Sequence, residues 1–212
     1  MRRNQLTFLP SALLLVGVVA AQTSDNRFVI VLIGPTGSGK TTQSEFIKRE
    51  FGISTIGVDD LIKENPAALE KYRTAGIDPG PPQTSPALNE LVRVRVTKMD
   101  LKKGIVLDGY PATKNQADHL ATLVRELGLP SPVVIQIDVP DEIVRKRLQK
   151  RKGPEDTPEQ IERRLKDYHR ELDMIRDYYP RANIWTIDGT RSPVDVSQTI
   201  QVILRDELPR RR

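Results

Sequence analysis

An unbroken apolar run, Phe28–Ile33, leads directly into the glycine-rich octapeptide Gly34–Thr41, GPTGSGKT. The octapeptide fits the pattern G-x-x-x-x-G-K-[ST] at every fixed position, and the residues from Lys40 to Phe51 continue as a helix. Between a strand and a helix, such glycines let the backbone N–H groups turn toward a phosphate, beside the positive end of the helix. This segment therefore predicts a strand–loop–helix unit that binds the phosphates of a nucleotide.

The pattern also assigns chemistry to particular side chains. Lys40 is expected to reach the β- and γ-phosphate oxygens, and the Thr41 hydroxyl is expected to bind Mg²⁺. The predicted nucleotide contacts in this segment are Gly37, Ser38, Gly39, Lys40, Thr41 and Thr42. The loop alone does not distinguish kinases from GTPases and motor ATPases.

The rest of the chain alternates predicted strands with predicted helices. Further β-branched or apolar runs lie at Ile53–Ile56, Ile105–Leu107, Val133–Val139 and Ile184–Ile187. Several helices are preceded by a capping pair: Ser85-Pro86, Thr157-Pro158 and Ser192-Pro193. This alternation predicts a three-layer α/β/α fold around a five-stranded parallel sheet, with ligands at the carboxyl ends of the strands.

One stretch departs from this alternation. The segment Asn65–Pro86 contains five prolines as well as Gly76 and Gly80. It predicts an inserted, loop-rich segment on the substrate side of the site.

Composition excludes several other classes of protein. A chain of 212 residues fits one α/β domain, and without cysteines it has neither disulfides nor a thiolate metal site. His119 and His169 fall within predicted helices without metal-ligand spacing, and are interpreted as helix-surface residues. The net charge is +5, but Lys and Arg are mixed with Asp and Glu, and only 5% of residues are aromatic. We therefore expect no nucleic-acid partner.

Residues 1–22 differ from everything that follows. A positive start, Met1–Arg3, precedes the mostly apolar stretch Leu6–Val19, and Val19–Ala21 offers small residues before Gln22. This pattern is typical of a secretory signal peptide and is too short and too interrupted for a stable membrane span. The residues thus indicate export. A misassigned start codon is the alternative, and ATP chemistry would then favour the cytoplasm.

Four further segments, taken in order with the loop, resemble the adenylate kinase (nucleoside monophosphate kinase) family of P-loop kinases. The loop itself continues to Gln43 as in the family, and Asp108–Pro111, DGYP, is similar to the family's D-G-F-P-R. Val139–Glu142, VPDE, is followed by Arg147 and Arg151 at family spacing. The segments Arg163–Leu165 and Asp188–Thr190 complete the set, and together they cover about Arg27 to Leu208.

The resemblance implies roles for particular residues. Asp108 would hold Mg²⁺ with Thr41, and Arg147, Arg151 and Arg191 would contact ATP. Lys40, Asp108, Arg151 and Arg164 would form the catalytic set. The residues implied for the acceptor are Asp60, Lys63, Gly109, Gln116 and Arg164, with Gln116 reading the base. The resemblance implies a domain at 27–208, an acceptor-binding insertion at 58–88, a monomer, and small nucleotide substrates.

The departures from the family fall on the acceptor side. Ala112 stands where the resemblance expects an arginine after DGYP, while Val58 and Lys63 replace a threonine and an arginine. The lid between Arg151 and Thr157, residues 151–157, is reduced to a few residues. Because each charge-assisted phosphate contact contributes about 1.5–3 kcal/mol, a weak monophosphate site is expected.

We therefore expect an ATP- and Mg²⁺-dependent phosphotransferase that acts on a nucleoside monophosphate. Two alternatives remain open. In a small-metabolite kinase of the shikimate or gluconate kind, Asp59 or Asp60 would bind an acceptor hydroxyl. In an ATP-binding protein of the same fold, the acceptor site would be catalytically weakened.

Overall fold

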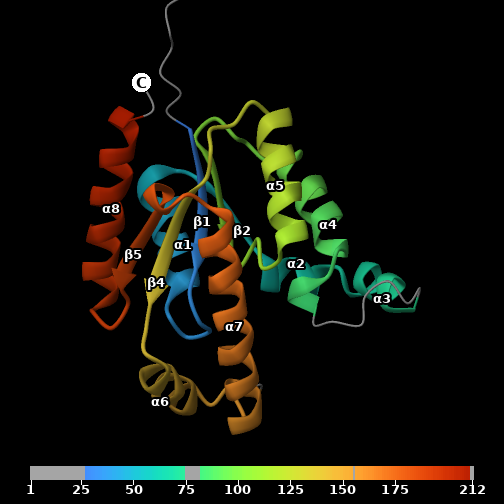
Figure 1. Ribbon diagram of the computed structural model, residues 1–212, viewed down its shortest axis with the longest axis vertical. Coiled ribbons are helices and arrows are strands. Elements are labelled where there is room, and N and C mark those ends of the chain that lie inside the picture. Colours follow the sequence, from blue (N-terminus) through green and yellow to red (C-terminus); the bar gives the residue numbers. More distant parts are fainter. Residues whose placement is uncertain (1–26, 75–81, 155, 211–212) are drawn as a thin grey trace, which may run out of the picture.

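The computed structural model describes residues 27–74, 82–154 and 156–210 of the chain. The secretion signal predicted for residues 1–22 lies outside these ranges and stays a prediction. Five parallel strands form one sheet in the order β2-β3-β1-β4-β5 (Figure 1). Their bounds are β1 Phe28–Ile33, β2 Ser54–Gly57, β3 Gly104–Asp108, β4 Val133–Asp138 and β5 Ile184–Asp188.

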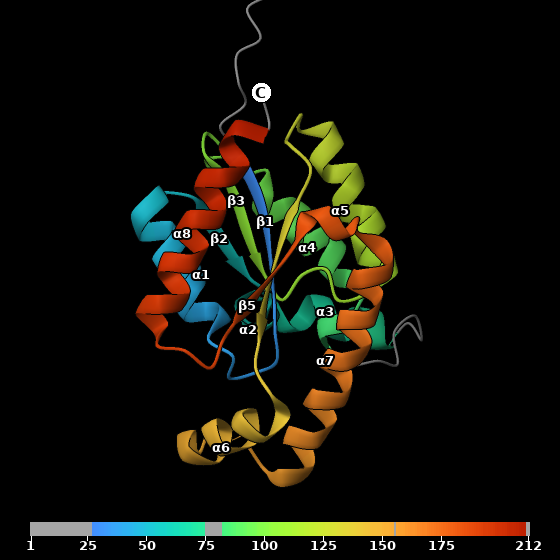
Figure 2. The same cartoon turned by 60° about the vertical axis from the view of Figure 1, so that its left-hand side comes forward.

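Helices cover both faces of this sheet, which makes the three layers expected from the sequence. Helices α1 and α8 pack on one face, and α4, α5 and α7 lie on the other (Figures 1 and 2). The helices are α1 Lys40–Phe51, α2 Val58–Glu64, α3 Pro66–Thr74, α4 Ala87–Val96, α5 Lys114–Glu126, α6 Asp141–Arg151, α7 Pro158–Tyr178 and α8 Pro193–Arg210, with 3₁₀ turns at Pro82–Thr84 and Arg181–Asn183.

The five predicted strands are confirmed to within about two residues at their ends, and the helix predicted from Lys40 to Phe51 has these bounds. Two of the three predicted capping pairs act as expected, whereas α4 begins at Ala87 with Pro86 itself as its cap residue. The Thr157 hydroxyl accepts from the Gln160 amide at 3.4 Å, and the Ser192 hydroxyl accepts from the Asp195 amide at 3.2 Å. Local capping chemistry therefore determined where these two helices begin.

Two interpretations of the sequence were wrong. The segment 65–86 was expected to be loop-rich, but its first part, Pro66–Thr74, forms α3, because a proline is well tolerated in the first turn of a helix; residues 75–81 lie outside the described residues. His119 was expected to be a surface residue, but it is half-buried and contacts the Tyr110 hydroxyl oxygen through Nδ1 at 2.9 Å. The pKa of His119 is lowered because burial disfavours its charged form.

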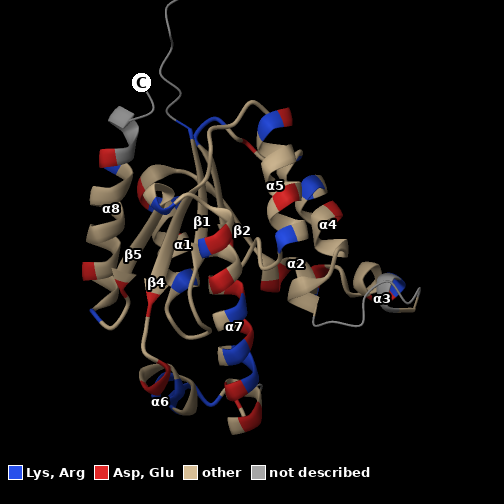
Figure 3. Cartoon of the chain, viewed as in Figure 1, with Lys and Arg blue, Asp and Glu red and all other residues tan. Residues whose placement is uncertain are grey.

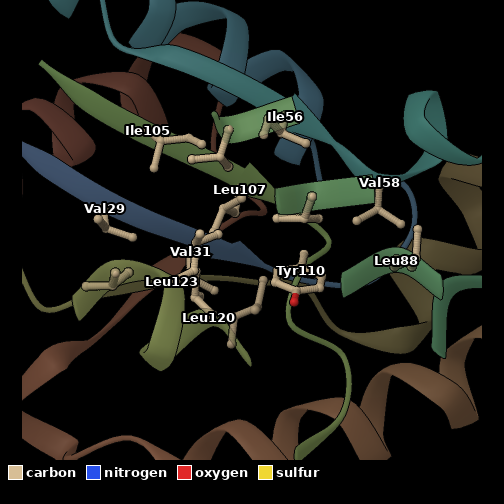
Figure 4. Packing of buried hydrophobic residues seen from close by; sticks show 14 of the residues in the cluster. Val29, Val31, Ile56, Val58, Leu88, Ile105, Leu107, Tyr110, Leu120 and Leu123 are labelled. Carbon is tan, nitrogen blue, oxygen red and sulfur yellow. The ribbon is translucent and has the colours of Figure 1, made fainter. Parts of the chain in front are cut away.

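The largest buried cluster lies between the sheet and the layer of α4, α5 and α7. Val29, Val31 and Leu107 from the strands meet Leu120 and Leu123 from α5 (Figure 4). Tyr110 is fully buried in the same cluster. The β-branched and leucine side chains that marked these strands in the sequence are thus buried where a parallel sheet is covered on both faces.

The sheet register brings two loops together at its carboxyl edge. Leu32 of β1 and Gly57 of β2 are both register partners of Asp108, the last residue of β3. The glycine-rich loop, which starts after Ile33, and the first turn of α2, which starts after Gly57, therefore flank Asp108. In the part of the chain that the structure describes, no helix is long and apolar enough to cross a membrane.

Candidate active site

The glycine-rich loop wraps around the start of α1. Gly39 caps this helix with φ at +99°, a left-handed conformation that side chains other than glycine rarely adopt. The Lys40 ammonium donates to the carbonyl oxygens of Gly34 at 2.6 Å and Pro35 at 3.3 Å. It is thereby held over the loop, with a third N–H still able to donate.

Thr41 and Asp108 meet beside this loop. The Thr41 hydroxyl donates to the Asp108 carboxylate at 3.0 Å, as expected for two residues that share a magnesium ion. Burial raises the pKa of Asp108, the positive charge of Lys40 and the Thr41 hydroxyl lower it, and the carboxylates of Asp59 and Asp60 raise it. The register of β1 and β3 brings these two residues together across 67 positions of sequence.

The residues present fit a phosphate chain and a magnesium ion. The buried Ser38 hydroxyl oxygen has no hydrogen-bond partner within the described residues, and an oxygen of a bound phosphate would supply one. Among residues 27–74, 82–154 and 156–210, no group of three or more acidic, His or Cys side chains could hold a metal. Magnesium at Thr41 and Asp108 would thus need phosphate oxygens and water as further ligands, which is its usual coordination.

Arg147 links the glycine-rich loop to the loop after β5. Its guanidinium donates to the Gly189 carbonyl at 2.8 Å and to the Gly37 carbonyl at 3.3 Å. Gly189 packs so tightly that a Cβ there would lie 2.6 Å from side chains of Ile137 and Val139. Arg191, also expected on the donor side, is half exposed and lies 3.7 Å from Asp195.

Arg151 and Arg164 come together at the connection between α6 and α7. Arg151 makes a bidentate pair with Asp156 at 2.8 and 2.6 Å, and Arg164 approaches the same carboxylate at 3.5 Å. The Asp156 side chain is only 1% exposed, and the Arg151 hydrogen bonds hold the pKa of this carboxyl below its ordinary value. The sequence predicted the two arginines but missed the aspartate that joins them.

The first turn of α2 forms the predicted acceptor side. The Asp60 carboxylate lies close to Gly57: a Cβ added to that glycine would be 3.1 Å from an Asp60 carboxylate oxygen. The Gln83 side-chain nitrogen lies 3.5 Å from a carboxylate oxygen of Asp59. The Lys63 side chain is exposed to solvent. Gly109 follows Asp108 with φ at +79°, facing Val58.

Gln116, expected to read the acceptor base, is completely buried. Its side-chain oxygen accepts from the Ala112 amide at 2.7 Å, and its side-chain nitrogen donates to the carbonyls of Gln83 at 3.1 Å and Ser85 at 3.3 Å. Gln116 therefore joins the loop after β3 to the segment before α4, and its role toward a base stays a prediction.

Glu171 on α7 is a charged residue near this site that the motifs did not indicate. It is partly buried, and burial raises the pKa of its carboxyl to about 7. Lys40 lowers that pKa and Asp108 raises it, so both lie within electrostatic range of Glu171. The only signal in the sequence was its helical spacing of seven residues from Arg164, which puts both on one face of α7.

The fold and the loop define this chain as a P-loop nucleotide-binding protein of the three-layer α/β/α class. Comparison with known proteins places it more narrowly. The family model described as adenylate kinase matches residues 32–184. The chain is 36% identical to an adenylate kinase of Micrococcus luteus over 181 residues, which span 81% of this chain and 87% of that protein.

Other relatives agree with this match. An adenylate kinase of Stenotrophomonas maltophilia is 34% identical over 76% of this chain and 90% of its own length. An adenylate kinase of a Cyanothece species is 31% identical over 82% of this chain and 94% of its own length. The chain belongs to the adenylate kinase family, and that family membership makes it a kinase-type phosphotransferase.

Proposed function

We propose that this protein transfers the γ-phosphoryl group of ATP to a nucleoside monophosphate in a magnesium-dependent reaction. The observation that carries the proposal is the Thr41–Asp108 hydrogen bond of 3.0 Å, beside an ammonium group held over a glycine-rich loop. A bound magnesium ion would neutralise charge that develops on the transferring phosphate. The unpartnered Ser38 hydroxyl supports a phosphate at the same place.

The chain's own residues position the reactants rather than form covalent bonds with them. The loop amides and Lys40 would bind the β- and γ-phosphates. Arg147 would fix the donor loop against the loop after β5 through its contact to Gly189. Arg151 and Arg164 would approach the transferring group from the α6–α7 connection, which in this family member is short. A phosphate acceptor is already nucleophilic and needs no general base.

A monophosphate acceptor is supported by the relatives named above, which are all adenylate kinases. On this side of the site, however, Ala112 has no charge where the family pattern has an arginine, and Lys63 has an ammonium in place of a guanidinium. Arginine binds a phosphate through a planar, bidentate pair of donors that lysine lacks. We therefore infer a weak monophosphate site.

One observation favours a second candidate, a small acceptor that offers a hydroxyl group. Asp59 and Asp60 lie close enough to Asp108 to raise its pKa, so two further carboxylates lie beside it at the first turn of α2. A carboxylate accepts a hydrogen bond from a hydroxyl group and would repel a phosphate dianion. The acceptor of such a kinase would offer a hydroxyl group in place of a phosphate dianion.

The test is production of ADP from ATP and Mg²⁺ with a panel of acceptors: AMP, CMP, UMP, GMP, shikimate, gluconate and glycerol. We expect the highest kcat/KM with a nucleoside monophosphate. Higher efficiency with a hydroxyl compound would favour the second candidate. If no acceptor supports ADP formation above that of Lys40→Ala, the proposal of phosphoryl transfer is wrong.

A further inference from the structure

Gln43 lies in the first turn of α1, directly behind Lys40 and Thr41, but has no part in the machinery proposed above. The residue is only 2% exposed. Its side-chain nitrogen donates to the Pro193 carbonyl oxygen at 3.0 Å, and its side-chain oxygen accepts from the Ser197 hydroxyl at 2.8 Å. Because a carbonyl oxygen only accepts, the amide nitrogen has to face Pro193, which fixes the orientation of this amide. Gln43 therefore joins α1 to the first residue of α8.

This amide lies in a contact between two helices that is otherwise mainly apolar. Ile47 of α1 belongs to the same buried cluster as Val196 and Ile200 of α8. Residues 196–204 of α8 include no charged side chain, and this part of the helix is tan in Figure 3. Burying an amide is costly unless its hydrogen-bond partners are fixed, and fixed partners specify the register between two elements. The Gln43 hydrogen bonds are therefore suited to fix where α8 begins relative to α1.

The loop between β5 and α8 is held at two points. Gly189 is held by the Arg147 guanidinium, which also contacts the glycine-rich loop. Pro193 is held by Gln43. Three residues lie between these two anchors, and one of them is Arg191, which the resemblance to the family assigns to ATP. The position of this short segment relative to the glycine-rich loop thus depends on one contact from α6 and one from α1.

This segment lies on the side of the site that is left for the nucleoside of the donor. The strand before the glycine-rich loop, β1, is central in the order β2-β3-β1-β4-β5. On the side of β3 and β2 lie Asp108 and the first turn of α2, which form the metal and acceptor side. In phosphoryl transfer the acceptor and the leaving group lie on opposite sides of the transferring phosphate. The donor nucleoside would therefore extend toward β4 and β5, where residues 189–192 lie.

We propose that Gln43 is a positioning residue for the donor nucleotide. By holding Pro193, it keeps Arg191 and the neighbouring loop at the distance from the glycine-rich loop that fits the nucleoside of ATP while the phosphates are bound. Because the Gln43 side chain contacts the start of α8 and not the glycine-rich loop, its loss affects the nucleoside and spares the phosphate chain. The inference rests on the proposed function, because it concerns how the same site binds its donor.

The test compares Mg·ATP with Mg·tripolyphosphate, a phosphate chain without a nucleoside, by titration calorimetry. Gln43→Met keeps the length of the side chain and removes both hydrogen bonds. We expect it to weaken Mg·ATP binding about tenfold and to change tripolyphosphate binding by less than about twofold. In rate measurements the KM for ATP should rise about tenfold while kcat at saturating ATP stays near the wild-type value. Gln198→Met, the same substitution at an exposed position of α8, is the control and should change none of these quantities.

Two results would overturn the proposal. Equal weakening of ATP and tripolyphosphate binding would show that Gln43 shapes the glycine-rich loop itself. Unchanged ATP binding would show that the amide only packs α1 against α8. If Gln43→Met is poorly folded by circular dichroism, Gln43→Leu provides the same test with another apolar side chain.

A second variant separates the anchor at Pro193 from helix packing in general. Ser197→Ala removes a buried hydroxyl from the same contact and leaves the Gln43 bond to Pro193 in place. It should bind Mg·ATP within about twofold of wild type. A loss as large as that of Gln43→Met would assign the effect to packing between α1 and α8 and would refute the positioning role.

Failure of this inference can be told from failure of the proposed function. Equilibrium binding needs no turnover, so the comparison of ATP with tripolyphosphate is informative even for a chain that transfers no phosphoryl group. Conversely, ADP formation in wild type with unchanged ATP binding in Gln43→Met would support the function and refute the role of Gln43.

Discussion

The donor side and the acceptor side of this site differ in how completely they match the family pattern. On the donor side, Lys40, Thr41, Asp108 and Arg147 are all present and are joined by hydrogen bonds of 2.6 to 3.3 Å. On the acceptor side, Ala112 is uncharged, Lys63 is exposed, and the nearest charges are carboxylates. This chain therefore keeps the donor-side residues of the family pattern and departs from that pattern on the acceptor side.

The largest effect is expected on the donor side. Lys40→Ala should lower kcat/KM about a thousandfold for every acceptor, because the variant loses the positive charge held over the β- and γ-phosphates. Initial rates of ADP formation measure it. Lys48→Ala, an exposed position on the same helix, is the control and should keep the wild-type rate. A Lys40→Ala variant with near wild-type turnover would contradict the role of the loop.

Asp156 pairs with both Arg151, expected to contact ATP, and Arg164, expected to contact the acceptor. Asp156→Asn should lower the free energy of unfolding by about 2 kcal/mol at pH 7, as hydrogen bonds to charged groups are lost. The arginines lower the pKa of Asp156 in the folded state. Its contribution is therefore complete above the unfolded value of about 3.9 and is lost as the pH falls through the folded value.

Urea unfolding of wild type and Asp156→Asn at pH 7 and near pH 3 measures this difference. We expect the difference between the two proteins to be smaller at the lower pH. Asp167→Asn, which breaks an exposed pair with Arg170, should change stability by less than about 0.5 kcal/mol. A difference for Asp156→Asn that is equal at both pH values would show that the charge of Asp156 is unimportant.

Activity toward a monophosphate acceptor should rise when an arginine is placed at position 112, where the family pattern has one. Ala112→Arg is expected to raise kcat/KM for the best nucleoside monophosphate about tenfold, equivalent to roughly 1.4 kcal/mol of transition-state stabilisation. The KM for ATP should hardly change. Ala112→Gln, which adds length without charge, is the matched control. If Ala112→Arg lowers activity, the acceptor side has been rebuilt around another contact, and the hydroxyl-acceptor alternative gains support.

The smallest effect concerns the loop that leads to Ala112. The Tyr110 hydroxyl donates to the Asn89 side-chain oxygen at 2.9 Å and lies 2.9 Å from His119 Nδ1. Tyr110→Phe should cost about 1 kcal/mol in unfolding free energy, since both partners lose a buried hydrogen bond. Tyr178→Phe removes an exposed hydroxyl contact to Asp118 and serves as the control. Equal thermal stability of Tyr110→Phe and wild type would contradict a structural role for this hydroxyl.

Local sequence signals were sufficient for the sheet, most of its helices and the donor loop. The β-branched runs were buried strands, and Thr157 and Ser192 cap helices, because these outcomes depend on residues near in sequence. The glycines and Lys40 form a phosphate loop for the same reason. The α3 helix was missed, since its proline was interpreted as a loop signal although proline is tolerated in a first helical turn.

Only the tertiary structure decided which distant groups meet. Thr41 reaches Asp108 through strand register, and Asp156 pairs with two arginines of the α6–α7 connection. Single residues on helical surfaces carry no motif, because their neighbours are set by packing between elements rather than by spacing along the chain. The sequence by itself thus determined the fold and the donor chemistry. Packing of α2 against the strand ends decided which carboxylates lie beside Asp108.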